Sequence, residues 1–114
     1  MTVLARDGYA ISEPNAALRR RVTMDELRAH RDEINAIADK YGVTNVRVFG
    51  SVARGEADDD SDLDLLIDID GGYFALSGFG LDVQDLLHVH TDVGTVNGLK
   101  PRIREQVLSE ALPL

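Results

Sequence analysis

Residues 62–70 alternate between aliphatic and acidic side chains, and this alternation is the feature that most limits how the chain can fold. The positions on one side of an extended backbone are all aliphatic: Leu63, Leu65, Ile67 and Ile69. The positions on the other side are mostly acidic: Asp62, Asp64, Leu66, Asp68 and Asp70. A period of two is typical of a strand with one face against a core and the other toward solvent. The segment therefore predicts a sheet that presents carboxylates.

Helical patterns surround this strand. A helix is predicted from Met24 to Tyr41, because Thr23 and Glu26 have capping-box spacing and Gly42 is a suitable stop. A second helix is predicted over residues 74–87, weakened by two glycines. A third is predicted over residues 100–111. Its apolar stripe is expected to be buried and consists of Ile103, Val107, Leu108 and Ala111.

Two more segments alternate with period two, residues 43–49 and 88–93. In the second, Val89, Thr91 and Val93 fall on one face, and His90 and Asp92 fall on the other. Strands and helices that are mixed along the chain predict an α+β fold with a small mixed sheet of three or more strands flanked by helices. The 114 residues fit a single domain, which we place at 22–114 after a partly ordered leader at 1–21 that could hold a short helix at 15–21.

The charge distribution narrows the possible ligands. No lysine or arginine lies between Arg54 and Lys100, but eleven aspartates and glutamates do, and the net charge is −8. Such a surface is unsuited to nucleic acid, although acids of this kind can bind divalent cations or simply be solvated. Cysteine is absent, which excludes thiolate chemistry. No stretch is apolar enough for a membrane span or signal peptide, so we expect a soluble, cytoplasmic protein with no membrane partner.

Gly50 and Ser51 follow the strand predicted over residues 43–49. A Gly-Ser pair between a strand and a short helix lets the backbone approach a ligand closely and offers N–H groups and a hydroxyl to an anion. This arrangement suits a phosphate.

Asp62 and Asp64 lie two residues apart on one strand face, so their carboxylates are about 6–7 Å apart. Without a cation they would repel each other, and hard oxygen ligands favour Mg²⁺. Asp92 adds a third carboxylate if its strand lies beside that of Asp64. Three carboxylates suffice for two Mg²⁺ ions at the ~3.5–4 Å spacing of two-metal phosphoryl-transfer sites.

The combined pattern resembles the DNA-polymerase-β-like nucleotidyltransferase superfamily. The string Phe49-Gly-Ser-Val-Ala-Arg-Gly-Glu56 followed by Ser61-Asp-Leu-Asp-Leu-Leu-Ile-Asp68 is similar to its smallest members, the minimal nucleotidyltransferases. The segments Asp92–Thr95 and Leu99–Arg104 and the closing Ala-Leu-Pro-Leu are similar too. The resemblance covers about residues 24–114 and implies the palm-like fold of that superfamily.

The resemblance also implies roles for individual residues. Gly50 and Ser51 match the triphosphate-binding pair, Asp62 and Asp64 match the metal-bridging aspartates, and Asp92 matches the aspartate that faces the attacking hydroxyl. Arg54 and Glu56 match positions near the nucleotide. The roles of Glu56, His90, Lys100 and Arg104 stay open. His90 shares a strand face with Asp92 and could approach the site, but it is interpreted as a surface histidine. Asp58, Asp59, Asp60, Asp68 and Asp70 are interpreted as solvated acids.

The function implied by the resemblance is that of a catalytic antitoxin. It would transfer AMP from ATP, with two Mg²⁺ ions, to a tyrosine hydroxyl of a HEPN-domain ribonuclease toxin. Two alternatives stay open: an antitoxin that neutralises its toxin by binding alone, and a transferase for a small molecule. The sequence does not determine the nucleotide, the number of groups transferred or the stoichiometry of a complex.

Overall fold

The computed structural model describes residues 19–114. The predictions for the leader up to residue 18, including the start of a short helix at 15–21, lie outside the described residues. In chain order the elements are α1 (Met24–Ala29), α2 (Arg31–Tyr41), β1 (Val43–Phe49), α3 (Gly50–Ala53), β2 (Leu63–Ile69), α4 (Tyr73–Leu87), β3 (Thr91–Gly94), the 3-10 helix η2 (Val96–Gly98), α5 (Pro101–Glu110) and β4 (Leu112–Pro113). None of the helices within residues 19–114 has the length and hydropathy to cross a bilayer.

The strands form one mixed sheet in the order β3-β2-β1-β4. β1 is antiparallel to β2 and β4, whereas β2 and β3 are parallel. The α+β class and the mixed sheet are therefore confirmed, with β4 as a fourth strand that the sequence pattern did not predict. β4 has only two residues, too few for an alternating pattern to be visible.

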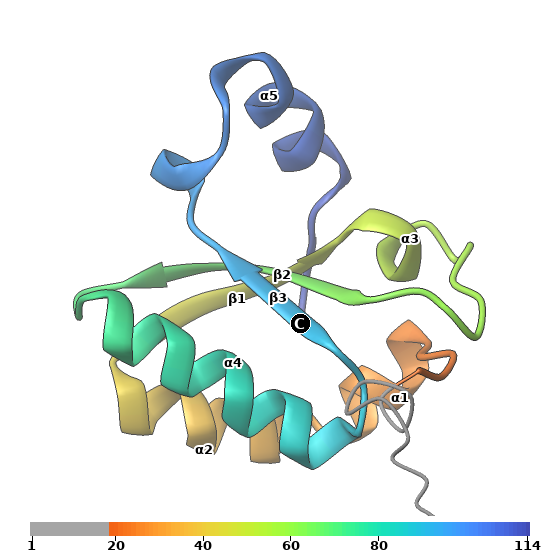
Figure 1. The fold of residues 1–114 in the computed structure, drawn as a ribbon, viewed down its shortest axis with the longest axis horizontal. Helices are drawn as coiled ribbons and strands as arrows, with labels where there is room; N and C mark the ends of the chain where they lie inside the picture. Colours follow the sequence, from red (N-terminus) through yellow and green to blue (C-terminus); the bar gives the residue numbers. More distant parts are fainter. Residues whose placement is uncertain (1–18) are drawn as a thin grey trace, which may run out of the picture.

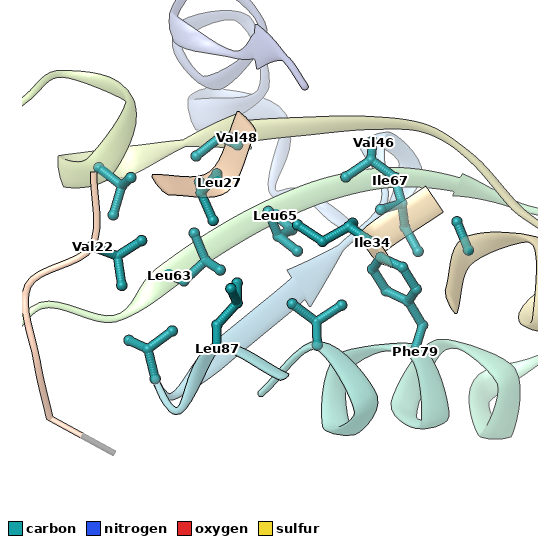
Figure 2. Packing of buried hydrophobic residues seen from close by; sticks show 14 of the residues in the cluster. Val22, Leu27, Ile34, Val46, Val48, Leu63, Leu65, Ile67, Phe79 and Leu87 are labelled. Carbon is teal, nitrogen blue, oxygen red and sulfur yellow. The ribbon is translucent and has the colours of Figure 1, made fainter. Parts of the chain in front are cut away.

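Helices α2 and α4 cover one face of the sheet, and the core lies between these two layers (Figure 1; Figure 2). The aliphatic side of β2 contributes Leu63, Leu65 and Ile67, each at most 1% exposed. Phe79 of α4 and Ile34 of α2 pack against this side and are buried as completely. The alternation in residues 62–70 therefore separates core from surface as predicted, except at Leu66, which lies on the acidic side but is fully buried.

The two glycines inside α4 are explained by close packing. A Cβ on Gly78 would lie 2.5 Å from Cε1 of the Tyr41 ring on α2. A Cβ on Gly80 would lie 3.1 Å from Cγ2 of Val93 on β3. A Cβ at Gly78 would force the Tyr41 ring to move, and one at Gly80 would press tightly on Val93, so both glycines favour close packing of α4.

The helix predicted from Met24 to Tyr41 is two helices, with the break at His30. The His30 backbone has φ −102° and ψ 15°, outside the helical region, and it ends α1 and begins α2. Its N–H is shared between the carbonyls of Glu26 and Leu27. The apolar pattern continues across this break because Leu27 and Ile34 both reach the core, so periodicity alone did not reveal it.

The third strand starts later than predicted, at Thr91 rather than His88. His88 ends α4 in the left-handed conformation with φ 55°, outside the extended region of a regular strand. Residues 89 and 90 then lead into the strand, and the Leu63 N–H already donates to the His90 carbonyl at 2.9 Å.

The prediction that α5 buries an apolar stripe was wrong. Ile103 and Leu108 are 40% and 42% exposed, and α5 has no buried residue. The helix lies on the side of the sheet away from α2 and α4 and stands off from it (Figure 1). On that side the sheet carries an ion pair between Arg47 and Asp68 and the fully buried Leu66, which pairs with Arg47 in the register of β1 and β2. Periodicity correctly located the helix but did not indicate what covers it.

Candidate active site

Asp64 and Asp92 lie side by side on neighbouring parallel strands. The register of β2 and β3 pairs them directly, so both side chains leave the same face of the sheet, the face opposite α2 and α4. Asp62 precedes β2 by one residue and belongs to the same face by alternation. The fold therefore brings together the three carboxylates that the sequence singled out.

The Asp64 carboxyl is the most perturbed acid of the group. Burial, followed by the nearby charges of Asp92 and Asp62, raises its pKa to about 6. Arg54 and His90 act in the opposite direction. A half-buried carboxyl near two other carboxylates favours either a proton or a nearby cation. Among the described residues, the donor atoms close enough together for a single ion come from Asp62, His90 and Asp92, and Asp64 lies next to this group.

Gly50 touches this carboxyl. It is the first residue of α3 and has φ +74°, in the region that favours glycine. A Cβ placed there would collide with Oδ2 of Asp64. The turn that carries Ser51 therefore lies directly against the carboxylate cluster, as expected for a phosphate-binding turn next to metal ligands.

Arg54 ends α3 and makes two ion pairs. Its Nε is 2.8 Å from Glu56 Oε1, and its Nη1 is 3.0 Å from Glu110 Oε1 on α5. The same guanidinium is close enough to Asp64 to lower the pKa of that carboxyl. Glu56 and Glu110 thus hold Arg54 at the edge of the site, and the distant Glu110 was not identifiable from the sequence.

His90 belongs to the cluster rather than to an unrelated surface. Its Nδ1 is 3.4 Å from Asp62 Oδ1 and 3.9 Å from Asp92 Oδ1. One potential ligand atom from each of Asp62, His90 and Asp92 falls within 4.8 Å of the others. The interpretation of His90 as a plain surface histidine overlooked this grouping, although its shared face with Asp92 was visible in the alternation of residues 89–93.

The carboxylates and the histidine are suitable donors for a divalent metal. Carboxylate oxygens are preferred by Mg²⁺ and Mn²⁺, and imidazole nitrogen is accepted by Mn²⁺ and later transition metals. Asp64 needs a positive partner because its own surroundings disfavour its charge. The residues present therefore fit a metal ion.

Three of the remaining candidates, Asp58, Asp68 and Arg104, have local hydrogen-bond partners. Asp58 accepts hydrogen bonds from the Asp60 N–H and then from the Ser61 hydroxyl, and these bonds lower its pKa. Asp68 accepts hydrogen bonds from Arg47 and Asn45. Lys100 precedes α5 as its N-cap, and Arg104 Nη2 donates to the Leu99 carbonyl at 3.2 Å. The structure gives none of these residues a contact with the carboxylate cluster.

Comparison with known proteins agrees with this geometry. The model of the family described as Nucleotidyltransferase domain matches residues 31–114. Protein adenylyltransferase MntA from Thermococcus cleftensis is 35% identical over 88 residues, which are 75% of this chain and 86% of the relative.

Solved structures give the same picture. A protein assigned as a minimal nucleotidyltransferase is similar with a TM-score of 0.71 at 44% identity, over 82% of this chain and 97% of that chain. A toxin–antitoxin structure with AMP-PNP is similar with a TM-score of 0.61 at 15% identity, over 72% of this chain and 69% of that chain, and supports the fold alone. The chain therefore belongs to the nucleotidyltransferase domain family, as one of its minimal members, and is an enzyme of nucleotidyl transfer.

Proposed function

We propose that this protein transfers AMP from ATP to a tyrosine hydroxyl of a HEPN-domain ribonuclease toxin and so acts as its antitoxin. The observation that carries the proposal is the direct pairing of Asp64 with Asp92 beside a glycine turn that contacts Asp64. This arrangement can hold metal ions, a triphosphate and an attacking hydroxyl within one small surface.

Each residue of the site would have a separate role in AMP transfer. The Gly50–Ser51 turn offers backbone N–H groups to the triphosphate, and Arg54 adds a positive charge at the edge of the site. Asp62, Asp64 and Asp92 hold two Mg²⁺ ions, and Asp92 faces the attacking hydroxyl. Magnesium, when bound, supplies positive charge that favours loss of the hydroxyl proton and departure of pyrophosphate. The oxygen of the acceptor forms a bond to the α-phosphorus as the bond to pyrophosphate breaks.

The choice of a protein acceptor is supported by the relatives. The similar protein of T. cleftensis is named a protein adenylyltransferase. The similar structures include toxin–antitoxin complexes, one of them with AMP-PNP. In addition, Asp62 and Asp92 are exposed, so a large acceptor could reach the carboxylate cluster. Added AMP would place negative charge on a ribonuclease surface that must attract RNA phosphates, which explains inhibition.

The test is a transfer assay with ATP, Mg²⁺ and the product of the adjacent gene, followed by intact-protein mass measurement. Label at the α-phosphate is expected on the acceptor, and label at the γ-phosphate is expected in pyrophosphate. Inhibition should be substoichiometric and should persist after the antitoxin is removed. An acceptor labelled from the γ-phosphate would instead identify a kinase. A toxin that recovers full activity on separation, with no added mass, would favour neutralisation by binding alone.

We further propose that His90 is a metal ligand together with Asp62 and Asp92. Binding of Co²⁺, followed by its visible absorption, tests this without any catalytic readout. H90Q is expected to weaken binding by about tenfold or more, since even indirect partners of a metal contribute at that level. H88N is the matched control, because His88 is close in sequence and asparagine tolerates its left-handed backbone. Equal Co²⁺ affinity in H90Q and the unaltered protein would exclude the ligand role.

A further inference from the structure

Strand β3 lies at one end of the sheet, next to the catalytic carboxylates. It pairs with β2 on one side, and within residues 19–114 no strand pairs with its other side. The Thr91 N–H donates to the Gln84 side chain of α4 at 3.2 Å rather than to a further strand. An open strand edge can pair with another chain, and natural sheets usually protect such edges. Here the Gln84 side chain occupies the Thr91 N–H, and within residues 19–114 no strand covers the rest of the edge beside Asp92.

A groove runs along this open edge, between α4 and β3. Its α4 side is formed by Tyr73, Ser77, Leu81 and Gln84, which are spaced along one helical face, and its β3 side is formed by residues 90–93. The groove has a volume of about 450 Å³. Tyr73 is 76% exposed and Leu81 is 56% exposed. Large apolar side chains gathered in this way are typical of interaction sites.

The side chains of β3 alternate between two faces, one toward α4 and one toward the carboxylates. Val93 faces α4, where it meets Gly80, and Thr91 shares that face by alternation. Asp92 points to the opposite face with Asp64. A strand added along β3 would therefore place alternate side chains over the apolar stripe of α4. The side chains between them would lie on the same face as Asp92.

The charge around the groove indicates which side chains a partner needs. The lining of the groove includes Asp92 and no lysine or arginine. Arg54, at the edge of the site, is already paired with Glu56 and Glu110. Magnesium ions arrive together with a triphosphate whose charge they offset, so the acidic surface stays unbalanced when both are bound. Basic side chains beside the acceptor hydroxyl would complement it.

We infer that the protein acceptor docks as an extended segment paired with β3, with apolar side chains over α4 and a hydroxyl flanked by basic residues on the face of Asp92. This inference rests on the proposed function, since it names how that acceptor is held. Backbone pairing supplies affinity, and alternate side chains supply specificity. The expected acceptor pattern is apolar, basic, apolar, hydroxyl, apolar, basic, apolar.

The probe is a capped peptide, Val-Lys-Val-Tyr-Val-Lys-Val, added to isotope-labelled protein without ATP or metal and followed by amide NMR. Shifts are expected at Thr91–Gly94 and along the Tyr73, Ser77, Leu81 stripe. L81D should weaken peptide binding by about tenfold, because a charge would then lie against apolar side chains. I103D is the matched control, since Ile103 is a similarly exposed apolar residue on α5, and binding should be unchanged.

Two altered peptides sharpen the test. N-methylation of the backbone N–H groups that face β3 should abolish binding, and glutamate in place of lysine should weaken it strongly. Shifts confined to α5, equal binding of the methylated peptide, or no shifts at millimolar peptide would overturn the inference. A dimer in solution that L81D dissociates would also overturn it, by making a second copy the occupant. Because no ATP is present, peptide binding at β3 supports the docking site even if transfer to a toxin fails.

Discussion

The two faces of β2 differ in burial and charge. One face is buried against α2 and α4 through Leu63, Leu65 and Ile67. On the other face Asp64 is half-buried beside two more aspartates. Each buried aliphatic side chain contributes roughly 1.5–3 kcal/mol to folding. The grouped carboxylates instead disfavour the folded state until a cation is bound. One strand therefore carries stability on one side and chemistry on the other, and substitutions on the two sides should separate these properties.

The largest expected effect is on the acidic side. D64N should lower AMP transfer by at least about 100-fold, since even indirect partners of a bound metal contribute that much. The fold should be retained, because asparagine removes a charge that burial and neighbouring acids disfavour. Steady-state transfer and circular dichroism would be measured together. D68N, on the same face of β2 but engaged with Arg47, should keep its activity. Unchanged turnover in D64N would exclude Asp64 as a ligand.

On the aliphatic side the expected effect is on stability. L65A should reduce the free energy of unfolding by about 2–5 kcal/mol, because it leaves a cavity between the sheet and its helices. Transfer activity per folded molecule should be close to that of the unaltered protein. Denaturant unfolding measures the first quantity and an assay well below the melting transition measures the second. L81A, on an exposed part of α4, should leave stability nearly unchanged. A large activity loss in folded L65A would show that the two faces are coupled.

A substitution at Gly50 should change both stability and transfer, because Gly50 lies on the side of the carboxylates and its backbone conformation favours glycine. G50A would place a Cβ against Asp64 Oδ2 and an L-residue at φ +74°. The conformational cost is about 1–2 kcal/mol, and the displaced carboxylate should reduce transfer as well. Unfolding and transfer assays on one preparation test both. G55A is the control, since Gly55 has φ +72° but open space at its Cβ, so it should lose stability alone.

The smallest expected effect is on the pH dependence of the folding stability of the metal-free protein. The pKa of Asp64 is raised from 3.8 to about 6 on folding, so between these values the native state binds more protons than the unfolded state. Stability attributable to this carboxyl is therefore fully present below about pH 4 and is lost as pH rises through about pH 6. The melting temperature of D64N minus that of the unaltered protein should grow over this interval and then level off. Saturating Mg²⁺ should reduce the difference. A flat difference across this range would contradict the raised pKa of Asp64, and D85N is the exposed control.

The sequence predicted those parts of the fold in which periodicity and burial coincide. The alternation around Leu65 placed β2 and its two faces correctly, and the Gly-Ser turn led to a short helix as expected. The exposed stripe of α5 was mispredicted because an amphipathic pattern does not identify the surface that covers it. The break at His30 and the strand β4 depend on backbone hydrogen bonds that leave no side-chain pattern.

The site was predicted to a similar extent. The spacing of Asp62, Asp64 and Asp92 indicated a shared metal site, and the register of β2 with β3 brings Asp64 and Asp92 together as that interpretation requires. The contact between Gly50 and Asp64 depends on how α3 packs against β2, which no local pattern encodes. The grouping of His90 with Asp62 likewise depends on two strands meeting.

The two glycines inside α4 also make formation of this helix depend on its tertiary contacts. Each costs about 1 kcal/mol of helix propensity relative to alanine, and an isolated segment of this length is marginal in water even without them. A free peptide of residues 73–87 should therefore be largely unstructured. The segment becomes helical only where the Tyr41 ring and Val93 fill the space above Gly78 and Gly80. The groove wall and the strand that carries Asp92 should accordingly form in one cooperative step. Hydrogen exchange at α4 and β3 should then report a single common opening free energy.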